Sequence, residues 1–372
     1  MARLGLGVLG ALALLLAGGP VSATNLYTVV DEFGQSRYLV QPQQILQDQP
    51  LPGGTVRFDP HALLIVLINT RRYFREYGDQ DVVAQRPGLL GALGISVADV
   101  TQTLDFLIEV LLEDLTRGRP LRLQDPAFLR RHLRALSWRA YRPDGGLFPR
   151  LRLTQYAVFR QPGCRQPRGA YRHALYQIRD EWVTDAFYRR YTKQEVLAGA
   201  LAPGRPDAHK VTPLAYLTRA GLEEALLQGT VLVQFPDRTT AYFNVDRHNG
   251  LPFVPGVPPW EQQRYWYFRE VGAIRGYGHT SESKIEIRPG VTLAGDVWNV
   301  GLGRVVLLER GPRQWLLGVI ADTGGAFSAN LAQLDHLAGV FASRREFFAY
   351  NRGWPAYTTV YILVRRKDHD PD

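Results

Sequence analysis

Short apolar segments, separated by glycine, proline and polar residues, follow one another from residue 230 to residue 364 of the 372-residue chain. Each is long enough for a β-strand and too short for an ordinary helix: residues 230–235, 241–245, 265–271, 284–287, 291–294, 304–308, 315–321 and 357–364. Many short strands at this spacing are typical of a β-barrel. The first two are expected to form a hairpin around Pro236-Asp237.

The first part of the chain carries helical patterns instead. Apolar residues recur every three or four positions over residues 61–77 and 96–112, which predicts two helices. Ser96 stands at the start of the second pattern and is a typical N-cap residue. A third, shorter helix is predicted over residues 126–136. We therefore expect an N-terminal helical region over residues 24–150.

The pattern changes at residue 151, where alternating residues up to 159 predict a strand that Pro162-Gly163 ends. Two helix starts follow this strand. Thr192-Lys193-Gln194-Glu195 has the form of a capping box and predicts a helix that continues to residue 201. Tyr216-Leu217-Thr218-Arg219 opens another predicted helix, which ends near Gln228-Gly229.

One of the short strands leads into two carboxylates. Residues 319–321 are apolar, Asp322 follows in a predicted turn, and Gly324 and Gly325 come next. Glycine lets the chain turn sharply and lets a ligand approach the backbone. A second carboxylate, Asp335, follows within reach of the same corner of the fold. An aspartate held at such a place is a candidate acid or base rather than a solvated charge.

The composition indicates a globular protein with an anionic partner. The hydrophobic fraction is 45%, and seven tryptophans exclude wholesale disorder. The formal net charge of +9 suits a nucleic acid, a membrane surface or a cell-wall polymer. Nucleic acid is the weakest of the three because no dense Lys/Arg tract with interleaved aromatic residues is present.

The N-terminus has the form of an export signal. Arg3 supplies a positive charge, residues 4–17 are apolar, and a small-residue cleavage site ends at Ala23, which makes Thr24 the expected mature start. No cysteine lies near this site, so we expect no lipid anchor. The single cysteine, Cys164, has no partner for an internal disulfide. The protein is therefore expected in the periplasm or cell envelope, soluble or peripherally associated.

Several other motifs point to weaker possibilities. Asp322-Thr323-Gly324 is also the signature of aspartic proteases, which need two such loops around one water, so a protease would have to be a homodimer. The plainer interpretation is a turn in which Asp322 binds backbone amides. His279 and Ser281 lack the Gly-x-Ser-x-Gly setting of a nucleophile. The eight histidines show no His-x-x-x-His pair, so no metal site is expected.

Taken together, these segments resemble the membrane-bound lytic transglycosylase A (MltA) family and the related 3D domains. The matches follow in the family's order: a Pro-Gly-Thr turn at residues 288–293, the Asp-Gly-Gly-Ala stretch at 322–327, a second aspartate motif at 334–339, and a closing Gly-Trp and strand at 353–363. Weaker matches are residues 153–156, 192–201, 216–219 and 249–250. The resemblance covers most of residues 150–364, and residues 319–339 are its most specific part.

The resemblance implies an α+β protein that is mainly β. Its parts would be a signal peptide at 1–23, the helical region at 24–150, a strand with an inserted β-rich domain at 151–260, and a double-psi β-barrel at 261–372 that carries the catalytic aspartate. The chain departs from the family pattern in three places, one of which is two extra residues between Gly325 and Asp335. The Gln-Gly-Ser-Gly segment has no copy between Val231 and Val245, and the first of three aspartates falls near Ser283.

The family cleaves the β-1,4 bond between N-acetylmuramic acid and N-acetylglucosamine in peptidoglycan. One carboxyl group suffices, because the C6 hydroxyl of the same sugar attacks the anomeric carbon and a 1,6-anhydro sugar forms. By motif position, Asp335 is the expected general acid and then base. Leu334, Leu337 and Ala338 would raise its pKa, and a charged His336 would oppose that shift. The resemblance implies no metal or organic cofactor, and its partner is the peptidoglycan glycan strand.

Six further residues are expected to bind substrate: Asp322, Thr323, Gly324, Gly325, Thr154 and Tyr156. Two other functions stay open besides the transglycosylase. One is a non-catalytic peptidoglycan-binding protein on the same barrel, which the missing Gly-Ser segment would favour. The other is the dimeric aspartic protease.

Overall fold

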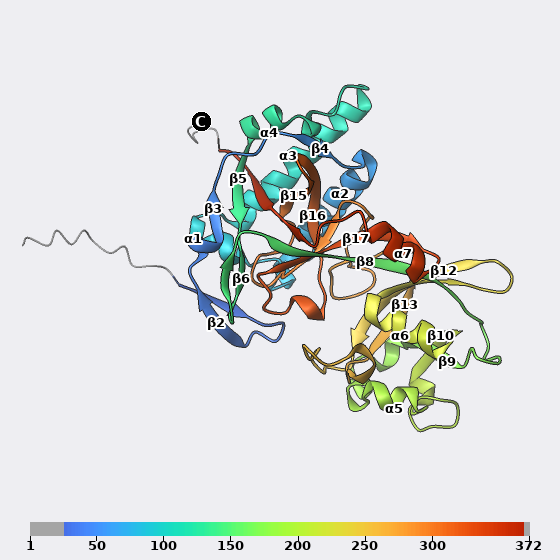
Figure 1. The fold of residues 1–372 in the computed structure, drawn as a ribbon. Helices are drawn as coiled ribbons and strands as arrows, with labels where there is room; N and C mark the ends of the chain where they lie inside the picture. Colours follow the sequence, from blue (N-terminus) through green and yellow to red (C-terminus); the bar gives the residue numbers. More distant parts are fainter. Residues whose placement is uncertain (1–25, 368–372) are drawn as a thin grey trace, which may run out of the picture.

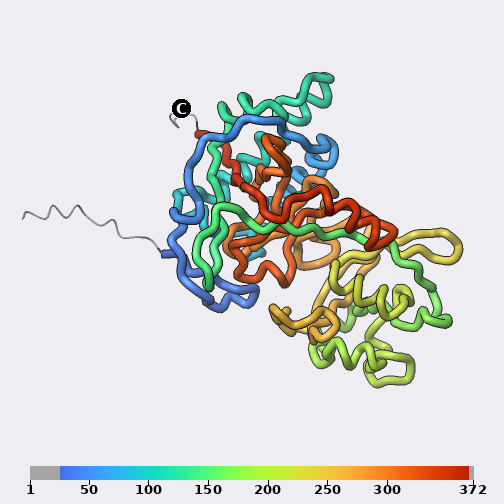
Figure 2. Tube along the Cα trace, in the orientation of Figure 1, coloured from blue at the N-terminus to red at the C-terminus, as the bar shows by residue number. Residues whose placement is uncertain are grey.

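The computed structural model describes residues 26–367, so the predicted signal peptide lies outside the described residues. The chain forms two bodies side by side (Figures 1 and 2). The larger body contains residues 26–162 and 272–367, and the smaller body, residues 163–271, is inserted between its two halves. Within the described range, no helix combines the length and the apolar character needed to cross a membrane.

A sheet of thirteen strands runs through both bodies (Figure 1). Along it the strands follow the order β13-β12-β11-β8-β17-β14-β16-β15-β19-β5-β3, with β18 beside β8 and β4 beside β16. Their bounds are β3 (Leu46–Asp48), β4 (Thr55–Arg57), β5 (Leu133–Trp138), β8 (Leu151–Pro162), β11 (Thr230–Gln234), β12 (Thr240–His248), β13 (Trp266–Val271), β14 (Thr292–Ala294), β15 (Val305–Gly311), β16 (Gln314–Asp322), β17 (Gln333–Phe341), β18 (Tyr357–Thr358) and β19 (Val360–Arg365).

Three two-stranded sheets and several helices surround this sheet. The small sheets pair β1 (Tyr27–Val30) with β2 (Ser36–Val40), β6 (Ala140–Arg142) with β7 (Gly146–Phe148), and β9 (His173–Ile178) with β10 (Val211–Leu217). The helices are α1 (Pro42–Ile45), α2 (Pro60–Tyr77), α3 (Val97–Thr116), α4 (Pro126–His132), α5 (Lys193–Leu197), α6 (Arg219–Gln228) and α7 (Arg344–Asn351). The prediction of an α+β protein that is mainly β is confirmed.

Two of the predicted N-terminal helices are confirmed, α2 and α3. The side chain of Ser96 accepts a hydrogen bond from the backbone N–H of Asp99, and the Asp99 carboxylate accepts one from Ser96, which completes a capping box at the start of α3. Each helix buries an apolar face in the core of the larger body, as Leu63 in α2 and Leu104 in α3 illustrate.

The predicted helix over residues 126–136 is wrong in its second half. Helix α4 ends at His132, and β5 begins at the next residue. Leu133, Leu136 and Trp138 are buried, and β5 pairs with β19 on one side and with β3 on the other. Tertiary pairing therefore overrides the local helical pattern.

The core of the larger body joins the two ends of the chain. One cluster of buried side chains includes Leu63 and Leu136 from the first half and Leu293, Leu317 and Ile362 from the second. The predicted helical region at 24–150 does contain α1–α4, but its strands β3, β4 and β5 belong to the same sheet as the C-terminal strands. The N-terminal region therefore contains strands of the main sheet as well as helices, and it is not a separate helical region.

The smaller body has two clusters of its own, built around β9–β13 and α6. Thr192 caps α5 through the predicted capping box, although that helix ends at Leu197 rather than at residue 201. Thr218 caps α6, so Tyr216 and Leu217 belong to β10 instead of the helix. The predicted hairpin is confirmed, because β11 and β12 pair antiparallel.

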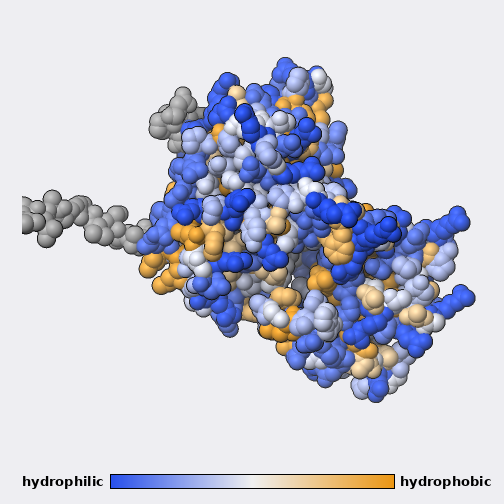
Figure 3. Space-filling view, viewed as in Figure 1, coloured by the Kyte–Doolittle hydropathy of each residue, from blue (hydrophilic) through white to orange (hydrophobic). Residues whose placement is uncertain are grey.

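Strand β8 carries the chain from one body into the other. Residues 152–159 pair in parallel with β17 in the larger body, and residues 159–162 pair in parallel with β11 in the smaller one. Parallel strands need long connections, and here the whole smaller body, followed by β14–β16, lies between β8 and its parallel partner β17 in the sequence. The surface is hollowed where the two bodies meet (Figure 3).

Candidate active site

Asp322 ends β16, as the sequence pattern predicts. Its Oδ1 accepts a hydrogen bond of 2.8 Å from the backbone N–H of Thr323. The hydroxyl of Thr323 donates a bond of 2.8 Å to the carbonyl oxygen of Gly295, just beyond β14. These two bonds fix the turn in which the carboxylate lies.

Asp335 lies inside a strand, which the sequence analysis missed. Residues 333–341 form β17, and β14 lies between β17 and β16. Ala294 on β14 is the register partner of both Asp322 and Asp335. Register partners point to the same face of a sheet, and two strand spacings separate these Cα atoms by roughly 10 Å. The fold therefore places the two carboxylates as neighbours on one face.

Strand β8 adds the next side chains to this face. Thr154 is the register partner of Asp335, and its hydroxyl accepts a hydrogen bond of 2.9 Å from Nε2 of Gln333. Two residues further on, the hydroxyl of Tyr156 donates a bond of 2.6 Å to Oδ2 of Asp322. The structure thus brings together four of the predicted site residues and adds Gln333.

Burial sets the protonation of Asp335. Its Oδ1 is inaccessible to solvent and has no hydrogen-bond partner among the described residues. Desolvation raises the pKa of Asp335 to about 7, and the negative charge of Asp322 acts in the same direction, whereas Thr154 and the charge of Arg152 oppose the shift. The carboxyl group is therefore substantially protonated near neutral pH, as a general acid must be.

His336, the next residue, does not oppose this shift. It is fully buried, and its ring packs on Trp354 with 4.4 Å between ring centroids. Burial lowers the pKa of His336 to about 4, so the imidazole is neutral at physiological pH.

Asp322 has a different environment. Burial raises its pKa to about 6, while hydrogen bonds from Tyr156 and Thr323 and the positive charge of Lys284 lower it. Asp322 is therefore the more acidic of the two carboxyl groups. Burial raises the pKa of both carboxyl groups, and at Asp322 two hydrogen bonds and a nearby cation favour the ionised form that a charged neighbour of an acid needs.

Lys284 is the residue that the sequence analysis missed most clearly. The segment 284–287 was expected to be a strand, but it forms only an isolated bridge between Arg275 and Glu286. The Lys284 side chain is buried, and its ammonium donates a hydrogen bond of 2.9 Å to Oδ1 of Asn244 and another to the carbonyl of Val245, both on β12. Lys284 itself belongs to the larger body, and these bonds hold its charged group against β12 of the smaller body.

The two glycines after Asp322 differ in their surroundings. A Cβ on Gly325 would lie 2.6 Å from Cβ of Phe253, so only glycine lets this turn meet the loop of the smaller body. Gly324 is exposed and has an extended backbone with φ of −165°. Close by, Arg264 of the smaller body forms a 2.9 Å ion pair with Glu32 in the β1–β2 turn. The site is therefore assembled from both bodies.

Two adjoining cavities lie at Arg152 and Gln333, two residues before Thr154 and Asp335 on β8 and β17. Their volumes are about 230 Å³ and 140 Å³, and Arg142, Arg152 and Ala332 line both. Gln333, which donates to Thr154, also lines the smaller cavity. Within residues 26–367, no group of three or more His, Cys, Asp or Glu side chains is arranged to hold a metal ion.

Comparison with solved structures identifies this architecture. A membrane-bound lytic murein transglycosylase from Agrobacterium tumefaciens aligns with a TM-score of 0.57 at 18% identity, over 83% of this chain and 93% of its own. The structure of E. coli MltA with bound chitohexaose aligns with a TM-score of 0.54 at 14% identity, over 87% and 95% of the two chains. The chain has the MltA fold.

The resemblance that the motifs gave is thus confirmed in the fold. A scan of the sequence against protein-family models finds no match, and a search of curated proteins finds none either. At such low identity it is three-dimensional structure, rather than sequence, that relates the chain to the MltA proteins. What the residues around Asp335 do in this version of the MltA fold follows from their own chemistry.

Proposed function

We propose that this protein is a peptidoglycan lytic transglycosylase that cleaves the β-1,4 bond between N-acetylmuramic acid and N-acetylglucosamine. The observation that carries the proposal is Asp335: a carboxyl group with an unpartnered, buried Oδ1 and a raised pKa, in a chain with the MltA fold. The fold neighbours are lytic murein transglycosylases, and one of them was solved with a bound chitohexaose.

In the first step, protonated Asp335 gives its proton to the glycosidic oxygen as the bond to the anomeric carbon breaks. The C6 hydroxyl of the same N-acetylmuramic acid attacks that carbon, and the Asp335 carboxylate takes the hydroxyl proton. The products are a 1,6-anhydro sugar and a free 4-hydroxyl group, and Asp335 is protonated again. No water enters, because the tethered hydroxyl has a very high effective concentration.

Asp322 acts as a binding and electrostatic group in this scheme. Its carboxylate is held by Tyr156 and Thr323, and an ionised Asp322 both keeps Asp335 protonated and stabilises positive charge that develops on the sugar ring. The backbone of Thr323, Gly324 and Gly325 and the hydroxyl of Thr154 are the other groups that we assign to the substrate.

The same proposal covers the finer architecture and the location. We assign the double-psi β-barrel to the larger body around β8, β14, β16 and β17. We assign the inserted domain to the smaller body, residues 163–271, whereas the predicted segment 151–260 also included the strand that leads into it. We also propose that the mature protein starts at Thr24 and acts in the periplasm or cell envelope without a lipid anchor.

Mass spectrometry of the soluble products from purified sacculi tests the proposed function. The mature protein, residues 24–372, should release muropeptides that end in 1,6-anhydro-N-acetylmuramic acid. Products with ordinary reducing ends would instead make the protein a hydrolase in which Asp322 activates water. Sacculi that stay bound but release nothing would favour the non-catalytic binding protein, and released peptides without sugars would favour the protease.

A further inference from the structure

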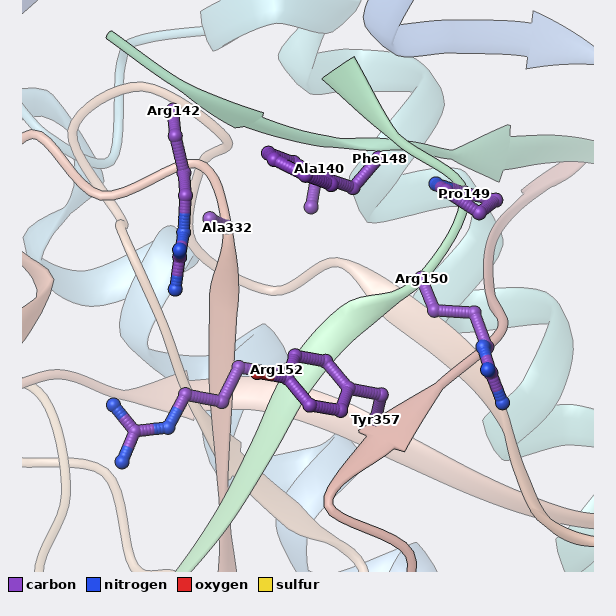
Figure 4. Close-up of a pocket in the computed structure, with 8 residues that line it drawn as sticks. All are labelled: Ala140, Arg142, Phe148, Pro149, Arg150, Arg152, Ala332 and Tyr357. Atoms are coloured by element: carbon purple, nitrogen blue, oxygen red, sulfur yellow. The ribbon is translucent and has the colours of Figure 1, made fainter. Parts of the chain in front are cut away.

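The two cavities at Arg152 share a positively charged wall. The larger cavity is bounded by β6, β7, β8 and β18, and the side chains of Arg142, Phe148, Arg152 and Tyr357 project from them (Figure 4). Arg142 and Arg152 line the smaller cavity too, on the same side of the view in Figure 4. Arg150 also lines the larger cavity, but its side chain points away from the other two (Figure 4).

Neither Arg142 nor Arg152 has an ion-pair partner in the part of the chain that the structure describes. None of the described residues that line either cavity is acidic. Arg142 and Arg152 form no ion pair within 4 Å among residues 26–367. Arg142 is held instead over the ring of Phe148, at 5.8 Å from its centroid. Two unpaired guanidinium groups at one concave site repel each other, and an anion that lies between them relieves this repulsion.

The positive wall adjoins the reaction centre. Arg152, Thr154 and Tyr156 alternate along β8 and therefore share one face, with about 7 Å between successive Cα atoms. Arg152 is the register partner of Gln333, and Thr154 is the register partner of Asp335. The Cα atom of Arg152 therefore lies about one strand repeat from that of Thr154, the register partner of Asp335.

We propose that Arg142 and Arg152 form a carboxylate-binding subsite for the substituent on the C3 oxygen of N-acetylmuramic acid. This proposal rests on the proposed function and names the part of peptidoglycan that the enzyme recognises besides the sugars. The planar guanidinium fork matches a carboxylate with two parallel hydrogen bonds. Tyr357 and Phe148 add apolar contact area at the rim of the cavity.

Two parts of peptidoglycan carry such a carboxylate. In an intact strand, the carboxylates belong to the stem peptide. In a strand from which an amidase has removed the peptide, the lactyl group itself ends in a carboxylate. Chitohexaose has the same β-1,4 backbone and no carboxylate, so it serves as the neutral control.

Calorimetric binding to these three ligands tests the subsite. The mature protein is used in an Asp335→Asn background, so that strands are not cleaved, with Arg142→Gln, Arg152→Gln and the double variant. Arg160→Gln is the matched control, because Arg160 is exposed on the same strand but lies outside both cavities. Each cavity variant should weaken binding of carboxylate-bearing strands by about tenfold or more and leave chitohexaose binding within about twofold.

The ligand that the cavity variants bind more weakly identifies which carboxylate of peptidoglycan occupies the subsite. Loss with intact strands alone assigns the subsite to the stem peptide, and loss with amidase-treated strands assigns it to the lactyl group. Equal losses for chitohexaose, or no loss for any ligand, would overturn the subsite while the proposed function stands. A parent protein that binds none of the three glycans would overturn both.

Discussion

The hydroxyl of Tyr156 on β8 donates a hydrogen bond of 2.6 Å to Oδ2 of Asp322 at the end of β16. The two residues are 166 positions apart in the chain, with the whole smaller body between them. This bond lowers the pKa of Asp322 against the effect of burial. It therefore links the strand that leads into the inserted body to the protonation of the site.

Tyr156→Phe should raise the pKa of Asp322 and destabilise the protein by about 1–3 kcal/mol, because a buried carboxylate oxygen loses its donor. Chemical denaturation and NMR titration of the Asp322 carboxyl carbon measure the two effects. Tyr242→Phe is the control, since the Tyr242 hydroxyl makes no hydrogen bond among the described residues. An unchanged pKa of Asp322 in Tyr156→Phe would contradict the assigned contact.

The plot of kcat/KM against pH should be a narrow bell-shaped curve. Asp335 must start protonated and Asp322 must be ionised, and burial raises their pKa values to about 7 and about 6. The kcat/KM for anhydro-muropeptide release should therefore be highest between about pH 6 and 7 and decline on either side. Arg152→Gln removes a charge that lowers the pKa of Asp335, so its alkaline limb should move to higher pH. An alkaline limb that does not move would show that Arg152 acts on binding alone.

Asp335→Asn should stabilise the fold above neutral pH. Because the folded-state pKa of Asp335 is raised, its contribution to stability is fully present below the unfolded pKa of about 4 and is lost as pH rises through about 7. Asparagine stays neutral throughout. At pH 8 the variant should exceed the wild type in free energy of unfolding by about 1 kcal/mol or more, and at pH 4 the two should agree. Urea denaturation at both pH values measures this, and a variant that is less stable at pH 8 would refute the buried, desolvated state of Asp335.

Lys284→Met should shift the acidic limb of the activity profile. The charge of Lys284 lowers the pKa of Asp322, so its removal raises that pKa and moves the limb to higher pH. Lys193→Met is the matched control, because Lys193 is also buried but pairs with Glu223 inside the smaller body. A shift of equal size in both variants would mean that the effect comes from general destabilisation.

Local signals in the sequence predict much of the fold. The capping boxes at Ser96 and Thr192 and the strand that ends at Asp322 depend on residues within a few positions of one another. The motif position of Asp335 could be read in the same way, although its strand could not. Strand β17 has a bulge between Leu337 and Gly339, and it pairs in parallel with a strand about 180 residues earlier in the chain. Neither feature leaves a pattern in residues 333–341 themselves.

The roles of Lys284 and Arg152 could not be predicted from the sequence, because each depends on residues that are distant in the chain. Lys284 begins the segment 284–287, which the sequence pattern predicts to be a strand, and its burial depends on Asn244 and Val245, about 40 residues away. Arg152 looks like the solvent-facing residue of an alternating strand. Its role depends on Arg142 and on the cavity that β6, β8 and β18 enclose together.

The role of Asp335 is tested most directly by incubating purified sacculi with the wild type and with Asp335→Asn and measuring anhydro-muropeptide release by mass spectrometry. A single general acid and base is expected to contribute about 10² to 10⁴ in rate. Asp335→Asn should release anhydro-muropeptides at least about a hundredfold more slowly than the wild type and should bind chitohexaose equally well. Release of anhydro products by a folded Asp335→Asn variant at a rate close to that of the wild type would contradict this role of Asp335.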